Sequence, residues 1–139
     1  KYMNNSVKNN IPILIVVLLV ICLFANHLIK KNAMLNSVDE SLLRYFLASS
    51  GYWVDLSEDV NNEYYLIFTD RSIRGVNITG KDIYMGIFDK SVTVDFDATL
   101  DSEGREVYVS GSLLLDYNKE QNMKWEACDS PSVYEYEIH

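Results

Sequence analysis

Thirteen consecutive residues without a polar side chain, Ile13 to Ala25, constrain this chain more than any other feature. With its apolar flanks the segment covers residues 11–29, and only Asn26 and His27 interrupt it, near one end. At about 1.5 Å per residue, a helix over this segment spans roughly 28 Å, close to the hydrocarbon thickness of a bilayer. We therefore predict a transmembrane helix. Its lipid-facing side chains are Ile13, Leu14, Ile15, Val16, Val17, Leu18, Leu19, Val20, Ile21, Leu23 and Phe24.

Two other interpretations of the apolar segment stay open. A buried helix of a soluble protein is disfavoured, because so small a chain has little interior to enclose a helix that is apolar all round. A cleaved signal peptide would fit the preceding lysines and the apolar core, but the exit Leu23-Phe24-Ala25 has a large residue where an A-x-A cleavage site requires a small one. Pro12 is expected in the first helical turn, where its missing N–H has no helical partner. An uncleaved anchor is the preferred interpretation.

The flanking charges leave the orientation nearly undecided, since two lysines precede the segment and two follow it. The ten residues before it are too few to fold, whereas the residues after it suffice for one domain. We therefore expect a cytoplasmic (inner) membrane protein with its C-terminal domain outside the cytoplasm. The expected parts are a polar tail (1–10), a transmembrane anchor (11–29), a linker that could instead continue the helix (30–36) and a β-rich domain (37–139).

Charge separates the two halves of the chain. Residues 1–31 contain four lysines and no acid, whereas residues 32–139 contain all 20 acidic residues and eight Lys or Arg, a net charge of −12. Nucleic acid and anionic headgroups repel so acidic a domain. Binding of DNA or RNA by the folded part is therefore not expected. The abundance of Asn, Lys, Tyr and Ile is typical of a low-GC bacterium.

A second, amphipathic helix is predicted immediately after the linker. Ser37 and Glu40 have the spacing of a capping box, and Gly51 can provide a left-handed C-cap. Apolar residues follow one another at helical spacing on one face, which should pack on a sheet. This face comprises Leu35, Val38, Leu42, Leu43, Phe46, Leu47 and Ser49.

From Tyr64 onward the apolar pattern changes to a period of two, which indicates strands. Asp70-Arg71 and Gly80-Lys81 are expected to be tight turns, and Gly111 indicates a bulge or a close approach by the helix. Successive hairpins give an antiparallel meander of six to seven strands in an α+β fold, either open or barrel-like. The expected strands are residues 64–69, 72–79, 82–89, 91–100, 105–117, 122–127 and 132–138.

No motif for catalysis, cofactor binding or metal binding is found in the sequence. His27 and His139 are too far apart for a triad or a zinc site, and there is no Gly-rich phosphate loop, C-x-x-C or G-x-S-x-G. Asp95 and Asp97 lie on one face of a strand, but the ligand order of a calcium loop is missing, which favours a solvated face. We expect neither an enzyme nor a cofactor or metal site.

Ten tyrosines are present, several of them on the expected strands. Tyrosine is favoured in strands and also at interfaces, because it buries a large area and keeps a polar tip. Tyr108 alternates with Val107 and Val109 and so faces away from the core, as Leu114 does. The alternative is that these tyrosines are ordinary surface residues of a sheet. The sharper hypothesis is a surface for a partner centred on Tyr108 and Leu114.

The organisation resembles two kinds of protein. A short inner tail, one span and a small outer β domain are similar to bacterial companions of membrane-spanning transcription regulators. This resemblance implies a single-pass accessory protein that binds or stabilises a membrane protein, or senses a small ligand. An apolar helix, an amphipathic helix and a sheet also resemble type IV pilins and pseudopilins, although the Gly-Phe junction and the acidic fifth residue of that family are missing from residues 1–10. The expected partners are the bilayer, a membrane protein or further copies of this chain.

Overall fold

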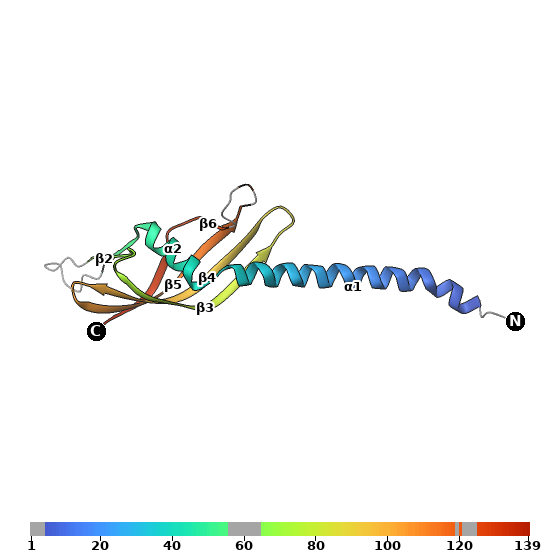
Figure 1. Ribbon diagram of the computed structural model, residues 1–139, viewed down its shortest axis with the longest axis horizontal. Helices are drawn as coiled ribbons and strands as arrows, with labels where there is room; N and C mark the ends of the chain where they lie inside the picture. Colours follow the sequence, from blue (N-terminus) through green and yellow to red (C-terminus); the bar gives the residue numbers. More distant parts are fainter. Residues whose placement is uncertain (1–4, 56–64, 119, 121–124) are drawn as a thin grey trace. The chain divides into compact units, whose positions relative to one another are not determined.

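The computed structural model describes residues 5–55, 65–118, 120 and 125–139, and it divides into two compact units, Lys1–Asn36 and Ser37–His139. It is α+β, with a long apolar helix, a short second helix and an open antiparallel sheet (Figure 1). The elements are α1 (Asn5–Ser37), α2 (Glu40–Ser50), β1 (Trp53–Asp55), β2 (Tyr65–Ile67), β3 (Ile73–Met85), β4 (Lys90–Ser102), β5 (Arg105–Tyr117), β6 (Trp125–Ala127) and β7 (Ser132–Ile138).

Helix α1 is one continuous helix of 33 residues, so residues 30–36 continue it. Its large apolar side chains from Ile13 to Phe24 are between 47% and 69% exposed. The helix is thus long and apolar enough to cross a membrane. The expectation for Pro12 was wrong. Because α1 already begins at Asn5, Pro12 lies inside the helix and removes one backbone hydrogen bond. Residues 1–4 of the expected tail lie outside the described residues.

Helix α2 begins later than the capping-box pattern predicts. Its N-cap is Asp39, whose Oδ1 accepts a hydrogen bond from the backbone N–H of Leu42 at 2.8 Å. Ser37 cannot cap α2 because it is the last residue of α1, and its hydroxyl oxygen accepts a hydrogen bond from Nε1 of Trp125 at 2.7 Å. The predicted C-cap is confirmed, since Gly51 adopts φ 59°.

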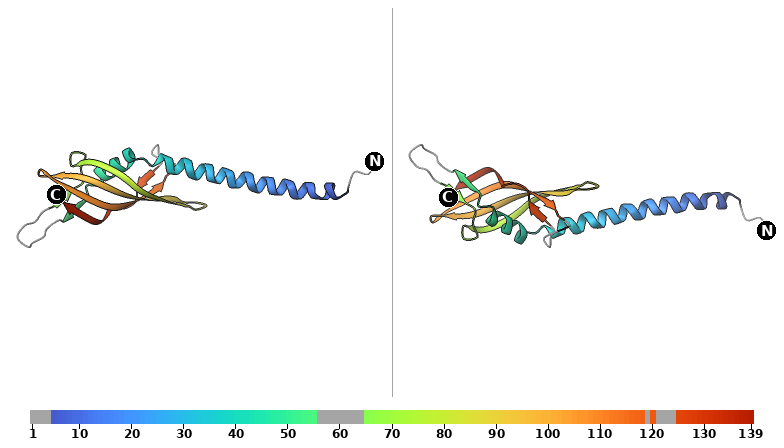
Figure 2. Two further views of the ribbon diagram at one scale, coloured as in Figure 1. Left: turned by 90° about the horizontal axis from the view of Figure 1, so that it is seen from below. Right: turned by 90° about the horizontal axis from the view of Figure 1, so that it is seen from above.

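The main sheet has five strands in the order β3-β4-β5-β6, and β7 also pairs with β5. The expected count of six to seven strands was too high for this sheet. The expected strands 72–79 and 82–89 form the single strand β3, with residues 86–89 in the turn that follows it. The first expected strand, β2, belongs to a separate two-stranded sheet with β1, which was not predicted. The final connection also departs from a meander. The three-residue β6 occupies only one end of β5, which leaves the rest of that edge for β7. Figure 2 shows the open sheet from two further sides.

The two expected turns have different outcomes. Asp70-Arg71 does lie in a turn, but the strands that it joins belong to different sheets. The turn predicted at Gly80-Lys81 was wrong, because β3 runs straight through both residues. The register shift between Ile78 and Gly80 shows the reason, since an irregularity in the ladder absorbs a glycine without ending the strand. Tyr64 and residues 122–124 of the expected strands lie outside the described residues.

The core lies between α2 and the inner face of β4 and β5. The predicted alternation is confirmed in β4, where all five inward residues are at most 3% exposed. From α2, the side chains of Leu43, Phe46 and Leu47 are buried, whereas Ser49 is exposed and Leu42 is only half-buried. The buried sheet residues are Ile73, Val92, Val94, Phe96, Ala98, Leu100, Val107, Val109, Leu113, Leu115 and Trp125.

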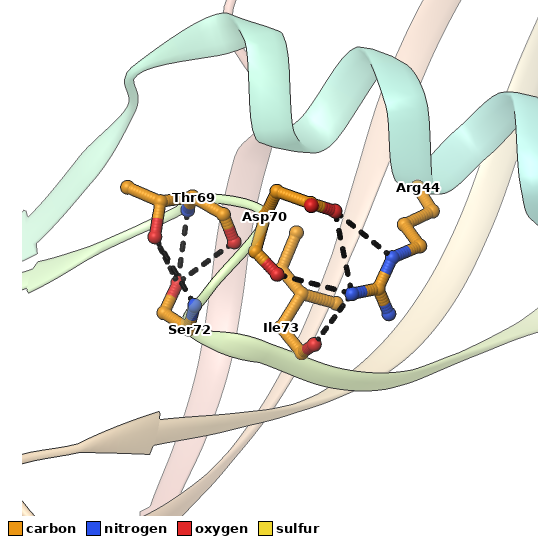
Figure 3. Close-up of polar contacts among 5 residues, drawn as sticks. All are labelled: Arg44, Thr69, Asp70, Ser72 and Ile73. Carbon is orange, nitrogen blue, oxygen red and sulfur yellow. Dashed lines mark hydrogen bonds and ion pairs between the residues drawn. The ribbon is translucent and has the colours of Figure 1, made fainter.

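One side chain of α2 also holds the start of β3. Arg44 Nη2 donates hydrogen bonds to the backbone carbonyl of Ile73 at 2.9 Å and to that of Asp70 at 3.1 Å (Figure 3). Its Nε lies 3.4 Å from Oδ1 of Asp70. Ser72 tightens the same turn by donating from Oγ to the carbonyl of Ile67 at 2.7 Å. These bonds to charged and backbone groups fix α2 against one end of the sheet.

Gly111 on β5 is a point of close packing. A Cβ added there would meet the carbonyl oxygen of Ser132 at 2.5 Å and Cζ of Phe96 at 3.0 Å. The expected bulge is present, as a register shift beside Gly111 in the pairing with β7. The element that approaches is β7 and not the helix.

Gly111→Ala is therefore expected to destabilise the domain by about 1–3 kcal/mol, because a methyl group would be forced between a backbone carbonyl and a buried ring. Chemical denaturation measures this. Gly75→Ala is the matched control, because no atom lies within 4 Å of a Cβ added at Gly75. Equal stability of the Gly111 variant and the wild type would contradict the close packing.

Candidate functional site

The outward side chains of four strands form two parallel rows across the sheet, and the strand register determines their order. The first row runs from β3 to β7 through Gly75, Thr99, Tyr108 and Glu137. The second row lies two residues along each strand and runs through Asn77, Asp97, Ser110 and Glu135. Directly opposite residues in an antiparallel pair have their Cβ atoms about 4.5–5.5 Å apart, so each row is a contiguous strip of surface.

These two rows line a shallow depression of about 450 Å³ on the outer face, which we call the outer hollow. Its depth follows from side-chain size, because Gly75 has no side chain and Thr99 and Ser110 have short ones. Longer side chains, among them Tyr108 and Glu137, stand at its side toward β7. The hollow therefore lies across the sheet and is open to solvent.

The electrostatic character of the outer hollow is acidic. Three of its lining residues carry carboxylates, Asp97, Glu135 and Glu137, and none of the described lining residues is Lys or Arg. Ser110 donates a hydrogen bond from Oγ to Oδ1 of Asp97 at 2.6 Å, which fixes that carboxylate at the centre of the sheet. Negative groups gathered on one surface attract cationic ligands and repel anionic ones.

Tyr108 provides the aromatic side of the hollow and is 41% exposed. Its hydroxyl donates to Oε2 of Glu106 at 3.0 Å, and this hydrogen bond is the main cause that raises the pKa of Tyr108. The ring meets that of His139 edge to face at a centroid distance of 5.0 Å. His139 is itself held, because its backbone N–H donates to the carbonyl of Glu106 at 2.9 Å. Tyr108 is thus oriented from both sides.

Of the two residues proposed from the sequence as a partner surface, Tyr108 lines the outer hollow and Leu114 does not. Leu114 is 37% exposed and faces outward on the same strand, opposite Thr93, six residues farther along. Glu135 and Glu137 were not predicted as part of this surface. Their alternation with tyrosines predicts a common face of the last strand, but no local pattern indicates that β7 lies beside β5.

The described titratable groups offer little for other chemistry. No group of three or more His, Cys, Asp or Glu residues in the described part is arranged to hold a metal ion. Cys128 is exposed as a residue, yet desolvation of its thiol, followed by a hydrogen bond with Asp116, raises its pKa to about 11. At neutral pH this thiol is protonated and is a weak nucleophile. The outer hollow is equipped to bind organic cations through carboxylates and a ring face.

Comparisons with protein-family models, with curated proteins and with solved structures find no match to this chain.

Proposed function

We propose that this protein is a single-pass, membrane-anchored accessory protein whose outer hollow binds a positively charged segment of a membrane protein partner. The observation that carries the proposal is the combination of three carboxylates and Tyr108 around one depression that no Lys or Arg of the described residues lines. Helix α1 supplies the anchor, since it is long and apolar enough to span a bilayer. No catalytic role is part of this proposal.

The form of the hollow favours side chains of a peptide over a small enclosed ligand. It is open and runs across four strands, so it can accept several lysine or arginine side chains at once. An Arg guanidinium can bond a carboxylate in a bidentate manner and can also stack on an aromatic ring. With a net charge of −12 on residues 32–139, the whole domain adds a long-range attraction for such a segment.

The proposed location is the outer side of a bacterial cytoplasmic membrane. There, loops and juxtamembrane segments of a partner that carry Lys or Arg would lie within reach of a tethered domain. Tethering raises the effective concentration of the two proteins, so a weak contact at the hollow suffices for a stable pair.

The test uses the full-length protein in detergent and a hexa-arginine peptide as the probe, followed by calorimetry. The double variant Asp97→Lys/Glu135→Lys is expected to bind about tenfold more weakly or worse, because two exposed ion pairs, each worth about 0.2–1 kcal/mol, become repulsions. Raising the salt concentration should weaken wild-type binding as well.

A control variant with the same change in net charge distinguishes binding at the hollow from attraction by the general acidity of the domain. Asp82 lies on the outer face of β3 but does not line the hollow, so Asp82→Lys paired with Glu103→Lys carries the same four-unit change. This control is expected to retain most of the affinity. An equal loss in both double variants would overturn the proposed site, and so would tighter binding of a neutral or acidic peptide.

A filament subunit of the pilin kind is the alternative, and the unbroken 33-residue helix α1 favours it. Purification in mild detergent distinguishes the two. An accessory protein is recovered with a stoichiometric membrane partner that the Asp97→Lys/Glu135→Lys variant loses. A subunit of this alternative kind assembles into fibres on dilution of the detergent.

A further inference from the structure

The turn between β3 and β4, residues 86–89, exposes the most solvent-accessible large apolar side chains of the described domain. Ile87 is 88% and Phe88 is 95% exposed. Next to them on β3, Tyr84 is 58% exposed. We call residues 86–89 the hairpin tip. Two adjacent apolar side chains almost fully in water at a turn are costly to keep in solution and mark a contact with an apolar phase.

Within the turn, Asp89 packs against Gly86. A Cβ added at Gly86 would meet Oδ1 of Asp89 at 2.5 Å and its carbonyl oxygen at 2.7 Å, so Asp89 folds back over Gly86. The one acidic group of the hairpin tip is exposed, and its carboxylate lies against Gly86. Ile87 and Phe88 are left at the crest of the turn.

The strand register shows at which end of the domain the hairpin tip lies. Met85 pairs with Lys90 to close the hairpin, and the next pair joins β4 to Asp116 through Ser91. One residue farther along β5, Tyr117 is paired with Trp125 of β6. The hairpin tip therefore projects from the end of the sheet that β6 occupies, and the β3–β4 hairpin extends past β6 in Figures 1 and 2.

The same end receives the chain from the apolar helix. Trp125 donates the hydrogen bond to Ser37 at 2.7 Å, and Ser37 is the first residue of the domain unit. Only seven residues, 30–36, lie between Ile29, the last residue of the apolar segment, and Ser37. If that segment spans a bilayer, this short tether keeps the Ser37 end of the domain close to the headgroup layer, and the hairpin tip belongs to that end.

We infer that the hairpin tip is a second membrane contact, in which Ile87 and Phe88 enter the headgroup layer of the leaflet beside the domain. This inference rests on the proposed membrane anchoring. Tyr84 suits the boundary, because aromatic rings with a polar tip favour the interface. The acidic domain is repelled by anionic lipid, so the contact is apolar and operates on zwitterionic headgroups.

Reaction of introduced thiols tests the contact in the full-length protein, with Cys22→Ser and Cys128→Ser as the background. The protein is reconstituted into phosphatidylcholine vesicles, and Ile87→Cys is treated with a membrane-impermeant maleimide. Glu103→Cys is the matched control, because it lies in the β4–β5 turn at the opposite end of the sheet. Normalising to this control removes the effect of vesicle orientation.

The thiol at position 87 is expected to react about tenfold more slowly than the control, as burial of one large apolar side chain implies. Adding Phe88→Ser should return its rate to that of the control. Flotation of the vesicles shows whether the protein is bound to them. If the protein floats with the vesicles and the thiol at position 87 still reacts rapidly, the tip contact alone is refuted. Protection only in native membranes would mean that a protein covers the hairpin tip and would also refute it. A chain that does not float with the vesicles would refute the anchor and this inference together.

Discussion

Replacement of Phe96 by Asp is expected to unfold the domain. The Phe96 side chain is fully buried beneath Gly111, at the centre of the β4–β5 pair. Truncating a buried Phe costs about 3–5 kcal/mol, and an unpaired buried carboxylate adds a further penalty. The sum is comparable to the 5–15 kcal/mol by which whole domains are stable. Circular dichroism should show loss of the β spectrum at all temperatures.

The matched control is Tyr84→Asp, which replaces an aromatic residue of the same sheet by the same acid at a side chain that is 58% exposed. Its melting temperature should stay close to that of the wild type. Leu43→Asp on α2 should behave like Phe96→Asp, since Leu43 is fully buried. A cooperative wild-type melt in Phe96→Asp would show that the inner face of the sheet is not the core.

Removal of the apolar helix is expected to transfer the protein completely from membrane to water. The eleven apolar side chains from Ile13 to Phe24 each favour the bilayer centre by about 0.3–0.6 kcal/mol, so together they supply about 3–7 kcal/mol. Residues 33–139 expressed alone should remain in the supernatant after ultracentrifugation, be monomeric and show a mainly β circular dichroism spectrum. Ser37–His139 form a compact unit of their own.

A helix-dominated spectrum, or an insoluble product, would contradict an independent domain. A fragment with the additional change Leu115→Asp serves as the negative control, because Leu115 is fully buried on the inner face and its loss should remove the melt. Comparison of the two fragments separates poor expression from poor folding.

Local patterns predict those parts of the fold that depend on sequence-near interactions. The alternation from Ser91 to Leu100 correctly predicted which residues of β4 are buried, and Gly51 correctly predicted the end of α2. The turn at Gly80-Lys81 was mispredicted, because a glycine in an irregular ladder and a glycine in a turn have the same local composition. Ser37 does not cap α2 because it is the last residue of α1, and its hydroxyl oxygen accepts a hydrogen bond from Trp125, 88 residues away in the sequence.

The candidate site was likewise predicted only where local patterns suffice. Tyr108 could be found from its outward position between two valines, as the sequence analysis proposed. Its neighbours Glu135 and Glu137 come from β7, which pairs with β5 because the short β6 leaves the edge free. Such non-local pairing depends on the energy of the whole sheet and leaves no trace in a short window of sequence. The exposure of Ile87 and Phe88 likewise emerges only when both strands of the hairpin are in register.

Membrane fractionation of the full-length chain tests the central claim most directly. Cells that produce the chain are lysed, and the membranes are washed with alkaline carbonate. The mass of the protein in each fraction is then determined by intact mass spectrometry. The anchored accessory protein proposed above predicts a full-mass chain that stays in the washed membrane pellet. A full-mass chain, uncut at its N-terminal end, in the aqueous supernatant would contradict the account.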